Sequence, residues 1–238
     1  MLLNNNDRYI RQIRLKEIGE EGQKKLCNSS VLIVGLGGLG SPVAMYLAGA
    51  GIGRIGLCDG DTVSEHNLHR QVLYDTASVG KLKSQCAMER LKALSPDTVF
   101  DLYSEELTDE NAVEIIREYN LVVDCCDNLW TRYTIEDTCA LMGKAWVHGA
   151  IEKFEGRLAL FNGSRNKRFS DIYPLRAWNC NPPTCIPAPG VLGPVAGVVG
   201  SLQAAEAIKY LAGIDSPVDG KMMIIDLLTL NTDLIEIE

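Results

Sequence analysis

The stretch VLIVGLGGLGSPVAMYLAGAGIGRIGLCD, residues 31–59, decides the fold. The apolar run Val31–Val34 ends at Gly35 and leads into a segment of helical period from about Gly38 to Ala50. A second run, Arg54–Cys58, follows and ends at Asp59. This order predicts a strand, a helix and a parallel strand, so the carboxyl ends of both strands meet at one edge of a sheet.

The same alternation continues to about Gly149 and then changes. We expect further parallel strands at Val99–Tyr103, Leu121–Asp124 and Ala145–His148, separated by helices at about Gly80–Leu94, after the Thr108–Asn111 capping signal, and up to Met142. The later elements are a strand at Arg157–Phe161, about thirty residues rich in Arg, Asn, Pro and Gly, a long helix at Gly193–Leu211, and closing strands at Met222–Asp226 and Asp233–Ile237. The prediction is a Rossmann-like doubly wound α/β sheet with a parallel N-terminal half, antiparallel C-terminal strands and a long crossover loop, all in one domain over residues 1–238.

Composition excludes several classes of protein. The chain has 238 residues, 46% of them hydrophobic, and a net charge of −8 from 23 basic and 31 acidic residues, so a basic surface for nucleic-acid phosphates is not expected. Met1–Arg14 carries charges and asparagines where a signal peptide would be apolar, and the longest apolar stretches contain glycine and fall short of the ~20 residues of a membrane span. We expect a soluble cytoplasmic protein whose eight cysteines are reduced thiols.

The glycine loop predicts a nucleotide site. Gly35, Gly37, Gly38 and Gly40 satisfy the pattern G-x-G-x-x-G between a strand and a helix, where glycine lets the backbone approach a phosphate and the helix N-terminus supplies N–H donors. Asp59, at the end of the next strand, is placed to bind ribose hydroxyls, which a simple tight turn would not explain. Both NAD and ATP enzymes share these features.

Cationic residues near this edge favour ATP over NAD. Arg70 and Gln71 lie in the loop after the second strand, and Lys83 begins the next helix, so a guanidinium and an ammonium converge on a triphosphate. The alternative for Lys83 is a solvated helix surface. Asp127 follows the fourth parallel strand, and a carboxylate facing phosphates implies an intervening Mg²⁺; its alternative role is the N-cap of the helix at Leu129.

At this point the residues carry a family resemblance. The chain resembles the MoeB/ThiF/HesA family, the bacterial relatives of ubiquitin-activating enzymes, through Arg8-Tyr-x-Arg11-Gln, the glycine loop, Asp59-x-Asp61, Asn67-x-x-Arg70-Gln71, Lys83, Asp124-x-x-Asp127-Asn128 and Gly190-Val-x-Gly-Pro194 leading to Gly200–Lys209. Such enzymes adenylate the C-terminal Gly-Gly carboxylate of a small ubiquitin-fold sulfur carrier and release pyrophosphate. The resemblance implies ATP and Mg²⁺ and a homodimer, and leaves thiamin and molybdopterin types of sulfur transfer open.

The resemblance also implies residue roles. It assigns ribose contact to Asp59, phosphate contacts to Asn67, Arg70 and Lys83, Mg²⁺ to Asp127, and the ATP of the neighbouring subunit to Arg11. Together with the glycines, the expected nucleotide contacts include Asp61, Gln71 and Asn128. Asp124 is a weaker candidate that suits a structural role. The segment 162–189 would cover a narrow channel for the Gly-Gly tail.

The sequence departs from the family pattern at its cysteines. Many members bind Zn²⁺ through two C-x-x-C pairs, whereas here four residues separate Cys180 from Cys185 and no cysteine follows, so we predict no zinc site. Some relatives link covalently to the carrier through a cysteine in this region. Cys185, five residues before Gly190, is the candidate, and an inert loop thiol is the alternative.

Other interpretations remain open. His66, His69 and His148 are expected on loop surfaces, because only His66-x-x-His69 has any ligand spacing. Within the same fold, the activated carboxylate could belong to a modified tRNA base or a peptide C-terminus, although the negative net charge disfavours tRNA. An NAD-linked oxidoreductase and a regulatory nucleotide-binding module without turnover are both disfavoured by the charged set of Arg70, Lys83 and Asp127.

Overall fold

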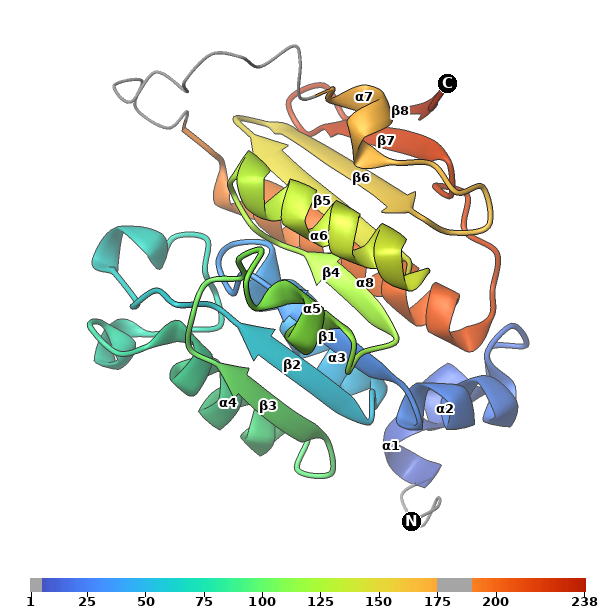
Figure 1. Ribbon diagram of the computed structural model, residues 1–238. Coiled ribbons are helices and arrows are strands. Elements are labelled where there is room, and N and C mark those ends of the chain that lie inside the picture. The colour runs from blue at the N-terminus through green and yellow to red at the C-terminus, as the bar shows by residue number, and fades with distance from the viewer. Residues whose placement is uncertain (1–5, 175–189) are drawn as a thin grey trace.

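The computed structural model describes residues 6–174 and 190–238 and is built on one eight-stranded sheet (Figure 1). The strands are β1 (Ser30–Val34), β2 (Arg54–Cys58), β3 (Val99–Tyr103), β4 (Leu121–Asp124), β5 (Trp146–Glu152), β6 (Glu155–Phe161), β7 (Lys221–Asp226) and β8 (Asn231–Glu236), in the spatial order β3-β2-β1-β4-β5-β6-β7-β8. The strands β1 to β5 are parallel, and β5 to β8 pair antiparallel. This confirms the predicted mixed sheet.

Helices cover both faces of the sheet. They are α1 (Asn6–Ile13), α2 (Gly19–Cys27), α3 (Gly40–Ala50), α4 (Lys83–Leu94), α5 (Ala112–Ile116), α6 (Leu129–Met142), α7 (Phe169–Ile172) and α8 (Gly193–Ala212), with short 3₁₀ turns η1 (Glu65–Asn67) and η2 (Thr76–Ser78). Figure 1 shows α5, α6 and α7 on the near face and α3, α4 and α8 behind the sheet.

Successive residues of a strand pack into two separate hydrophobic cores, one on each face of the sheet. In β1, Val31 and Ile33 pack with α3, α4 and α8, whereas Leu32 and Val34 pack with α5, α6 and α7. Side chains alternate between the two faces of a strand, so a strand covered on both sides needs a continuous apolar run. The Val31–Val34 and Leu121–Asp124 runs have this character because their strands lie in the middle of the sheet.

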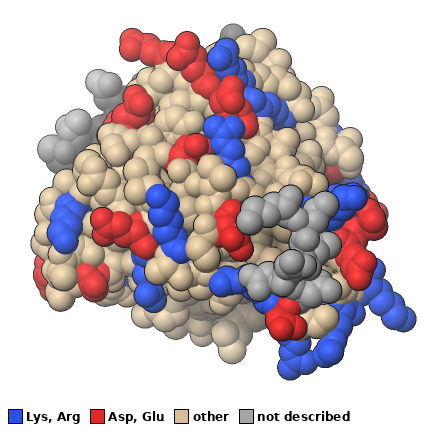
Figure 2. All heavy atoms as spheres, turned by 90° about the horizontal axis from the view of Figure 1, so that it is seen from below, with Lys and Arg blue, Asp and Glu red and all other residues tan. Residues whose placement is uncertain are grey.

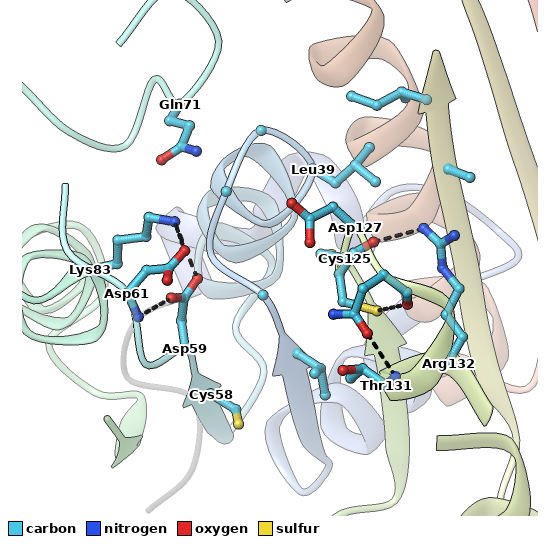
Figure 3. Close-up of a pocket in the computed structure, with 18 of the residues that line it drawn as sticks. Leu39, Cys58, Asp59, Asp61, Gln71, Lys83, Cys125, Asp127, Thr131 and Arg132 are labelled. Carbon is cyan, nitrogen blue, oxygen red and sulfur yellow. Dashed lines mark hydrogen bonds and ion pairs between the residues drawn. The ribbon is translucent and has the colours of Figure 1, made fainter. Parts of the chain in front are cut away.

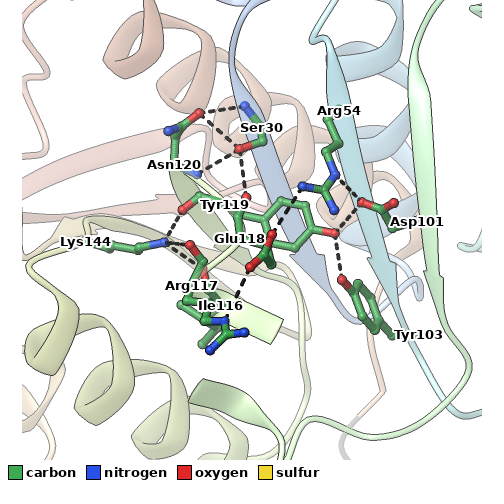
Figure 4. Close-up of polar contacts among 10 residues, drawn as sticks. All are labelled: Ser30, Arg54, Asp101, Tyr103, Ile116, Arg117, Glu118, Tyr119, Asn120 and Lys144. Atoms are coloured by element: carbon green, nitrogen blue, oxygen red, sulfur yellow. Dashed lines mark hydrogen bonds and ion pairs between the residues drawn. The ribbon is translucent and has the colours of Figure 1, made fainter. Parts of the chain in front are cut away.

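A polar cluster fixes the sheet at the end where β1, β2 and β4 begin (Figure 4). The Tyr119 hydroxyl donates to Asp101 Oδ2 at 2.8 Å, and Arg54 Nε donates to the same oxygen at 2.6 Å. Lys144 Nζ donates to the carbonyls of Ile116, Arg117 and Tyr119 around the end of α5. These contacts lie away from the edge where the parallel strands end.

The segment after β6 is more ordered than its composition predicts. Residues 162–174 contain α7, and Phe169 within it is 1% exposed. The described part of the crossover segment is therefore anchored to the sheet. Residues 175–189 lie outside the described residues.

The distribution of surface charge and the character of the helices bear on the expected partners. In the view of Figure 2, basic and acidic side chains are intermixed over the described part of this face rather than separated into one basic patch. None of the helices in residues 6–174 and 190–238 has both the length and the apolar character that crossing a membrane requires.

Candidate functional site

A cavity of about 510 Å³ opens at the carboxyl ends of β1, β2 and β4. Its walls are the glycine loop after β1, the Asp59–Asp61 turn after β2 and the Cys125–Asn128 loop after β4. Figure 3 shows Lys83 with two carboxylates on one side of the glycine loop, and Asp127 and Arg132 on the other. Open α/β sheets bind ligands at such an edge, where neighbouring connections leave on opposite faces.

The glycine loop leaves room for a ligand because its backbone is tightly folded. Gly35 has φ 89°, and a Cβ there would lie 2.7 Å from the carbonyl oxygen of Cys125. Gly37 and Gly38 line the cavity. Gly40 does not line it, and a Cβ at Gly40 would lie 2.1 Å from the Gly35 carbonyl oxygen. Gly40 therefore shapes the turn in this structure, and the nucleotide contact expected of it from the sequence stays a prediction.

Asp59, Asp61 and Lys83 form a compact charged group. Asp59 accepts hydrogen bonds from the backbone N–H groups of Leu36 at 2.7 Å and Asp61 at 2.8 Å. Lys83 Nζ lies 2.7 Å from Asp61 Oδ2 and 3.9 Å from Asp59 Oδ2. Burial raises the pKa of Asp59, while Lys83 and the two N–H donors oppose that rise. Lys83 is only 5% exposed, which excludes the solvated-surface alternative.

The loop after η1 supplies a second cation. Arg70 lines the cavity, with Nη1 2.8 Å from His69 Nε2. Gln71 also lines it, and its buried Oε1 has no hydrogen-bond partner among the described residues. Asn67 is buried outside the cavity lining, and its carbonyl accepts from the N–H groups of Arg70 and Gln71. Asn67 thus holds the turn in this structure, whereas His66 is exposed as expected.

The Cys125–Asn128 loop separates the roles of two neighbouring polar residues. Asn128 Oδ1 accepts from Thr131 N at 2.9 Å, so Asn128 is the N-cap of α6. Asp127 therefore does not have the capping role that was its alternative. Its exposed carboxylate lines the cavity and has no hydrogen bond or ion pair within the described part of the chain.

The donor set suits Mg²⁺ held jointly with a substrate. Within residues 6–174 and 190–238, no group of three or more His, Cys, Asp or Glu side chains is arranged to hold a metal ion. Mg²⁺ commonly keeps several waters and binds through one or two carboxylates plus substrate phosphates, and Asp127 in the cavity wall fits that pattern.

Behind the loop lies a buried charged network that sequence reasoning largely missed. Asp124 is fully buried; its Oδ2 lies 2.7 Å from His148 Nδ1 and 3.2 Å from Arg132 Nε. Burial alone would raise the pKa of Asp124, but Arg132 and His148 outweigh it and lower that pKa. His148 is 1% exposed, so its expected position on a loop surface is wrong. It lies on β5, which is covered on both faces.

Two arginines in the cavity wall were also absent from the prediction. Arg132 lies in the first turn of α6, four residues after the N-cap Asn128, and this closeness to the predicted loop could have identified it. Arg157 on β6 lines the cavity too and donates to Glu155 and to the Tyr173 hydroxyl. No local motif marks Arg157, because only the pairing of β6 with β5 brings it to this edge.

Two expected residues lie apart from the cavity. Arg11 is exposed on α1, which packs near the C-terminal end of α3, where Gln12 Nε2 donates to the Ala50 carbonyl at 3.2 Å. The cavity lies at the opposite, N-terminal end of α3, so Arg11 does not reach it within one chain (Figure 1). Cys180 and Cys185 fall outside the described residues, so the covalent role of Cys185 and the absence of zinc stay predictions.

Comparison with known proteins identifies close sequence relatives. A model of the ThiF family matches residues 9–238. The chain is 46% identical to a sulfur carrier protein adenylyltransferase from Thermus thermophilus, covering 93% of this chain and 83% of that protein. It is 43% identical to the adenylyltransferase and sulfurtransferase MOCS3 of Drosophila yakuba, covering 94% of this chain but only 50% of the relative. The chain thus spans about half the length of the MOCS3 relatives.

Solved structures share the fold. The structure of PaaA superposes with a TM-score of 0.84 at 23% identity, covering 100% of this chain and 75% of that one. A structure of E. coli MccB with ATP has a TM-score of 0.82 at 22% identity and covers 98% of this chain and 72% of that one. At these identities the likeness concerns the fold alone.

Proposed function

The chain belongs to the ThiF family, and we propose that it is an adenylyltransferase that uses ATP to activate the C-terminal Gly-Gly carboxylate of a small ubiquitin-fold sulfur carrier, releasing pyrophosphate. The observation that carries this proposal is the cavity itself, in which Asp59, Lys83, Arg70 and Asp127 surround the glycine loop. The 46% identity to a sulfur carrier protein adenylyltransferase supports the same activity and carrier class. One adenylation domain over residues 1–238 is part of the proposal.

The nucleotide would bind across the glycine loop. In the proposal, Asp59 accepts hydrogen bonds from the ribose hydroxyls, and the N–H groups near Gly37 and Gly38 approach the phosphates. Lys83 and Arg70 neutralise phosphate charge from one side of the loop. Lys83 is well suited to this role because its burial among carboxylates fixes the ammonium group in one place.

Asp127 would hold Mg²⁺ against the phosphates. When bound, the ion would neutralise phosphate charge that builds up as the α-phosphate is attacked. Asp127 contributes one carboxylate to this site. Because Asn128 caps α6, the Asp127 carboxylate is not used for capping. Arg132 binds the Cys126 carbonyl at 2.7 Å and so fixes the backbone beside Asp127.

The chemistry then needs positioning more than proton transfer. The carrier carboxylate is ionised at pH 7, so one of its oxygens can attack the α-phosphorus without a general base while the bond to the pyrophosphate oxygen breaks. The electron pair of that bond leaves with pyrophosphate. Lys83 and Arg70 stabilise the charge that develops on the phosphate oxygens. In the proposal, Arg11 of a neighbouring subunit adds a third cation, which makes the active form a homodimer.

The carrier tail would reach the α-phosphate beneath the crossover segment 162–189. A Gly-Gly terminus suits this path, since glycine alone lets a chain pass close beneath another backbone. Cys185 in this segment is the proposed candidate for a covalent link with the carrier. The cytoplasm is the proposed location of the reaction.

The nearest alternative is a ThiF-family enzyme that activates a different carboxylate, such as a peptide C-terminus or a modified tRNA base. A relative of 46% identity that is named a sulfur carrier protein adenylyltransferase, and one of 43% identity that is named an adenylyltransferase and sulfurtransferase, favour the carrier. An NAD-linked oxidoreductase is disfavoured because it has no use for Lys83, Arg70 and Asp127 around the phosphates.

The decisive experiment is pyrophosphate exchange into ATP with Mg²⁺ and candidate carriers ending in Gly-Gly. We expect exchange only with such a carrier, and an acyl-adenylate mass on the carrier in mass spectrometry. A carrier lacking its last glycine is the matched control and should be inactive. Binding of NAD without ATP, or exchange driven equally by the truncated carrier, would refute the proposal.

A further inference from the structure

The floor of the cavity is connected to the crossover segment through one buried side chain, His148. Asp124 ends β4 directly before the Cys125–Asn128 loop. Its Oδ1 accepts from the Cys126 backbone N–H at 3.0 Å and from the Cys126 thiol at 2.7 Å. Its Oδ2 binds His148 Nδ1 at 2.7 Å. The lowered pKa keeps Asp124 ionised at neutral pH, so Nδ1 carries the hydrogen and donates.

The ring of His148 is held by aromatic side chains from three elements. Trp146 lies beside it on β5 with ring centroids 5.8 Å apart, and Phe161 of β6 lies at 5.9 Å. The nearest centroid belongs to Phe169 of α7, at 5.2 Å in an edge-to-face arrangement. Phe169 is the one member that comes from the crossover segment, so the position of α7 bears directly on the His148 ring.

The segment 162–174 is itself tied to α6 and to the cavity wall. Ser170 N donates to Glu136 Oε1 at 2.9 Å, and the Tyr133 hydroxyl donates to the Tyr173 carbonyl. Arg157, which lines the cavity, donates to the Tyr173 hydroxyl at 2.9 Å. A ligand that displaces Arg157 or segment 162–174 would therefore also displace α7 and Phe169.

We propose that His148 is a positioning residue that links the placement of segment 162–174 to the shape of the Cys125–Asn128 loop. When α7 is seated, Phe169 holds the imidazole ring, the imidazole holds Asp124, and Asp124 holds the loop that presents Asp127. When α7 is displaced, the ring loses its nearest neighbour and the bond to Asp124 loosens. In describing the loop as the ATP site, this inference rests on the proposed function.

The contacts of the two side chains indicate that His148, rather than Arg132, connects α7 to the Cys125–Asn128 loop. Arg132 Nη2 binds the Cys126 carbonyl directly at 2.7 Å, and none of the hydrogen bonds that Arg132 makes within the described residues reaches α7. His148 contacts both Phe169 and Asp124, and within the described residues it makes no hydrogen bond to the loop itself. In general, packed side chains that have two discrete arrangements can transmit a displacement from one site to another.

Three substitutions separate the two contacts of His148, and a fourth, Tyr133→Phe, is a substitute for one of them. His148→Phe keeps a ring against Phe169 but removes the donor to Asp124. His148→Asn keeps a donor near the position of Nδ1 but removes the ring. Phe169→Leu removes the aromatic neighbour without touching Asp124 or the loop. Tyr133→Phe loosens α7 without opening a core cavity and serves where Phe169→Leu does not fold.

The first readout is hydrogen exchange of the Cys126 amide in the protein without ligands. We expect Phe169→Leu and His148→Phe each to speed exchange by roughly three-fold or more, because the Asp124 acceptor is no longer fixed. In the His148→Asn background, Phe169→Leu should add nothing, since the link is already absent. Tyr119→Phe, at the far end of the sheet, is the matched control and should leave Cys126 exchange unchanged.

The second readout is the split between kcat and KM in adenylation. Phe169→Leu should lower kcat by roughly three- to ten-fold with little change in the KM for carrier, because the loop and not the docking surface is altered. Unchanged Cys126 exchange in Phe169→Leu, or equal acceleration in the His148→Asn background, would overturn the inference. Exchange is measured without ATP or carrier, so a failure of the proposed function would leave this test intact.

Discussion

Asp127 is the single residue on which the proposed chemistry depends most. Replacing it with alanine removes the one carboxylate of the Cys125–Asn128 loop that faces the cavity without a partner in the described chain. We expect pyrophosphate exchange to fall by about 10³-fold or more, the loss that follows removal of a metal ligand or phosphate clamp. Asp127→Ala should fold normally, because Asn128 still caps α6.

The matched control for Asp127 is Glu110→Ala, an exposed carboxylate outside the cavity lining. It removes the same charge from the protein and should leave exchange unchanged. Full activity in Asp127→Ala would show that Mg²⁺ and ATP are held by other groups.

His148 makes the stability of the fold depend on pH. Burial lowers the pKa of His148 below its ordinary 6.5, opposed by Asp124 and assisted by Arg132 and Arg157. Below pH 6.5 the unfolded chain binds a proton that the folded chain rejects, so the free energy of unfolding falls as the pH drops, until the folded pKa is reached. Asp124, with its lowered pKa, contributes stability that is lost only below about pH 3.8.

The resulting prediction compares wild type with His148→Asn between pH 7 and pH 5. Wild type should lose up to about 1.4 kcal/mol of unfolding free energy per pH unit from this group, and the variant should show a shallower slope. Urea denaturation at the two pH values measures both. Equal slopes would mean that His148 is not buried in its neutral form.

At the scale of elements, the sequence was most informative where burial is local. The bounds of β2, β3 and β4 match the predictions. For β4 the reason is burial on both faces, which favours a continuous apolar run, whereas β3 is a partly exposed edge strand that carries Asp101. The helix α7 was missed because its four residues are held by Phe169 in a tertiary aromatic contact. The burial of His148 was missed for the same reason.

The residues of the candidate site also fall into those that a local motif predicts and those that only tertiary packing places. Residues in motifs, such as Asp59 and Lys83, were predicted to meet because the carboxyl ends of parallel strands share an edge. Arg157 was not, since its position follows from the antiparallel register of β6 against β5, which no short motif encodes. Gly40 and Asn67 belong to the right motifs but support the loops instead of lining the cavity.

Lys144 gives an element-scale prediction for α5. Its ammonium group binds three carbonyls around the C-terminal end of this short helix, and the Ile116 carbonyl among them also accepts from the Tyr119 backbone N–H at 3.1 Å. Lys144→Met keeps the aliphatic stem and should lower the free energy of unfolding by about 1–3 kcal/mol. Urea denaturation measures this loss. Adenylation should be unchanged, because this end of the sheet is far from the cavity; a loss below 0.5 kcal/mol, about the lower limit for one hydrogen bond, would contradict the capping role.

At the scale of the whole molecule, the cysteine spacing predicts a protein that does not depend on zinc. No C-x-x-C pair is present, so purified protein should contain no stoichiometric zinc by elemental analysis. A chelator should leave the melting temperature unchanged, whereas a bound structural zinc would contribute several kcal/mol to folding. One zinc per chain would show that other residues assemble a site.

The last prediction concerns the homodimer. Arg11 is exposed on α1, at the end of α3 away from the cavity of its own chain. If it acts on the neighbouring subunit, Arg11→Ala and Asp127→Ala homodimers should both be inactive, because each site lacks one essential group. Mixed under subunit exchange, the two variants should recover activity, since each heterodimer has one site with its own Asp127 and the partner's intact Arg11.

The size of the recovery distinguishes the two arrangements. In an equal mixture about half of the dimers are heterodimers with one complete site of two, which gives roughly a quarter of wild-type activity for an arginine supplied in trans. If Arg11 acted within its own chain, one site of the heterodimer would lack Arg11 and the other Asp127. The mixture would then stay inactive, and pyrophosphate exchange at several mixing ratios measures the difference.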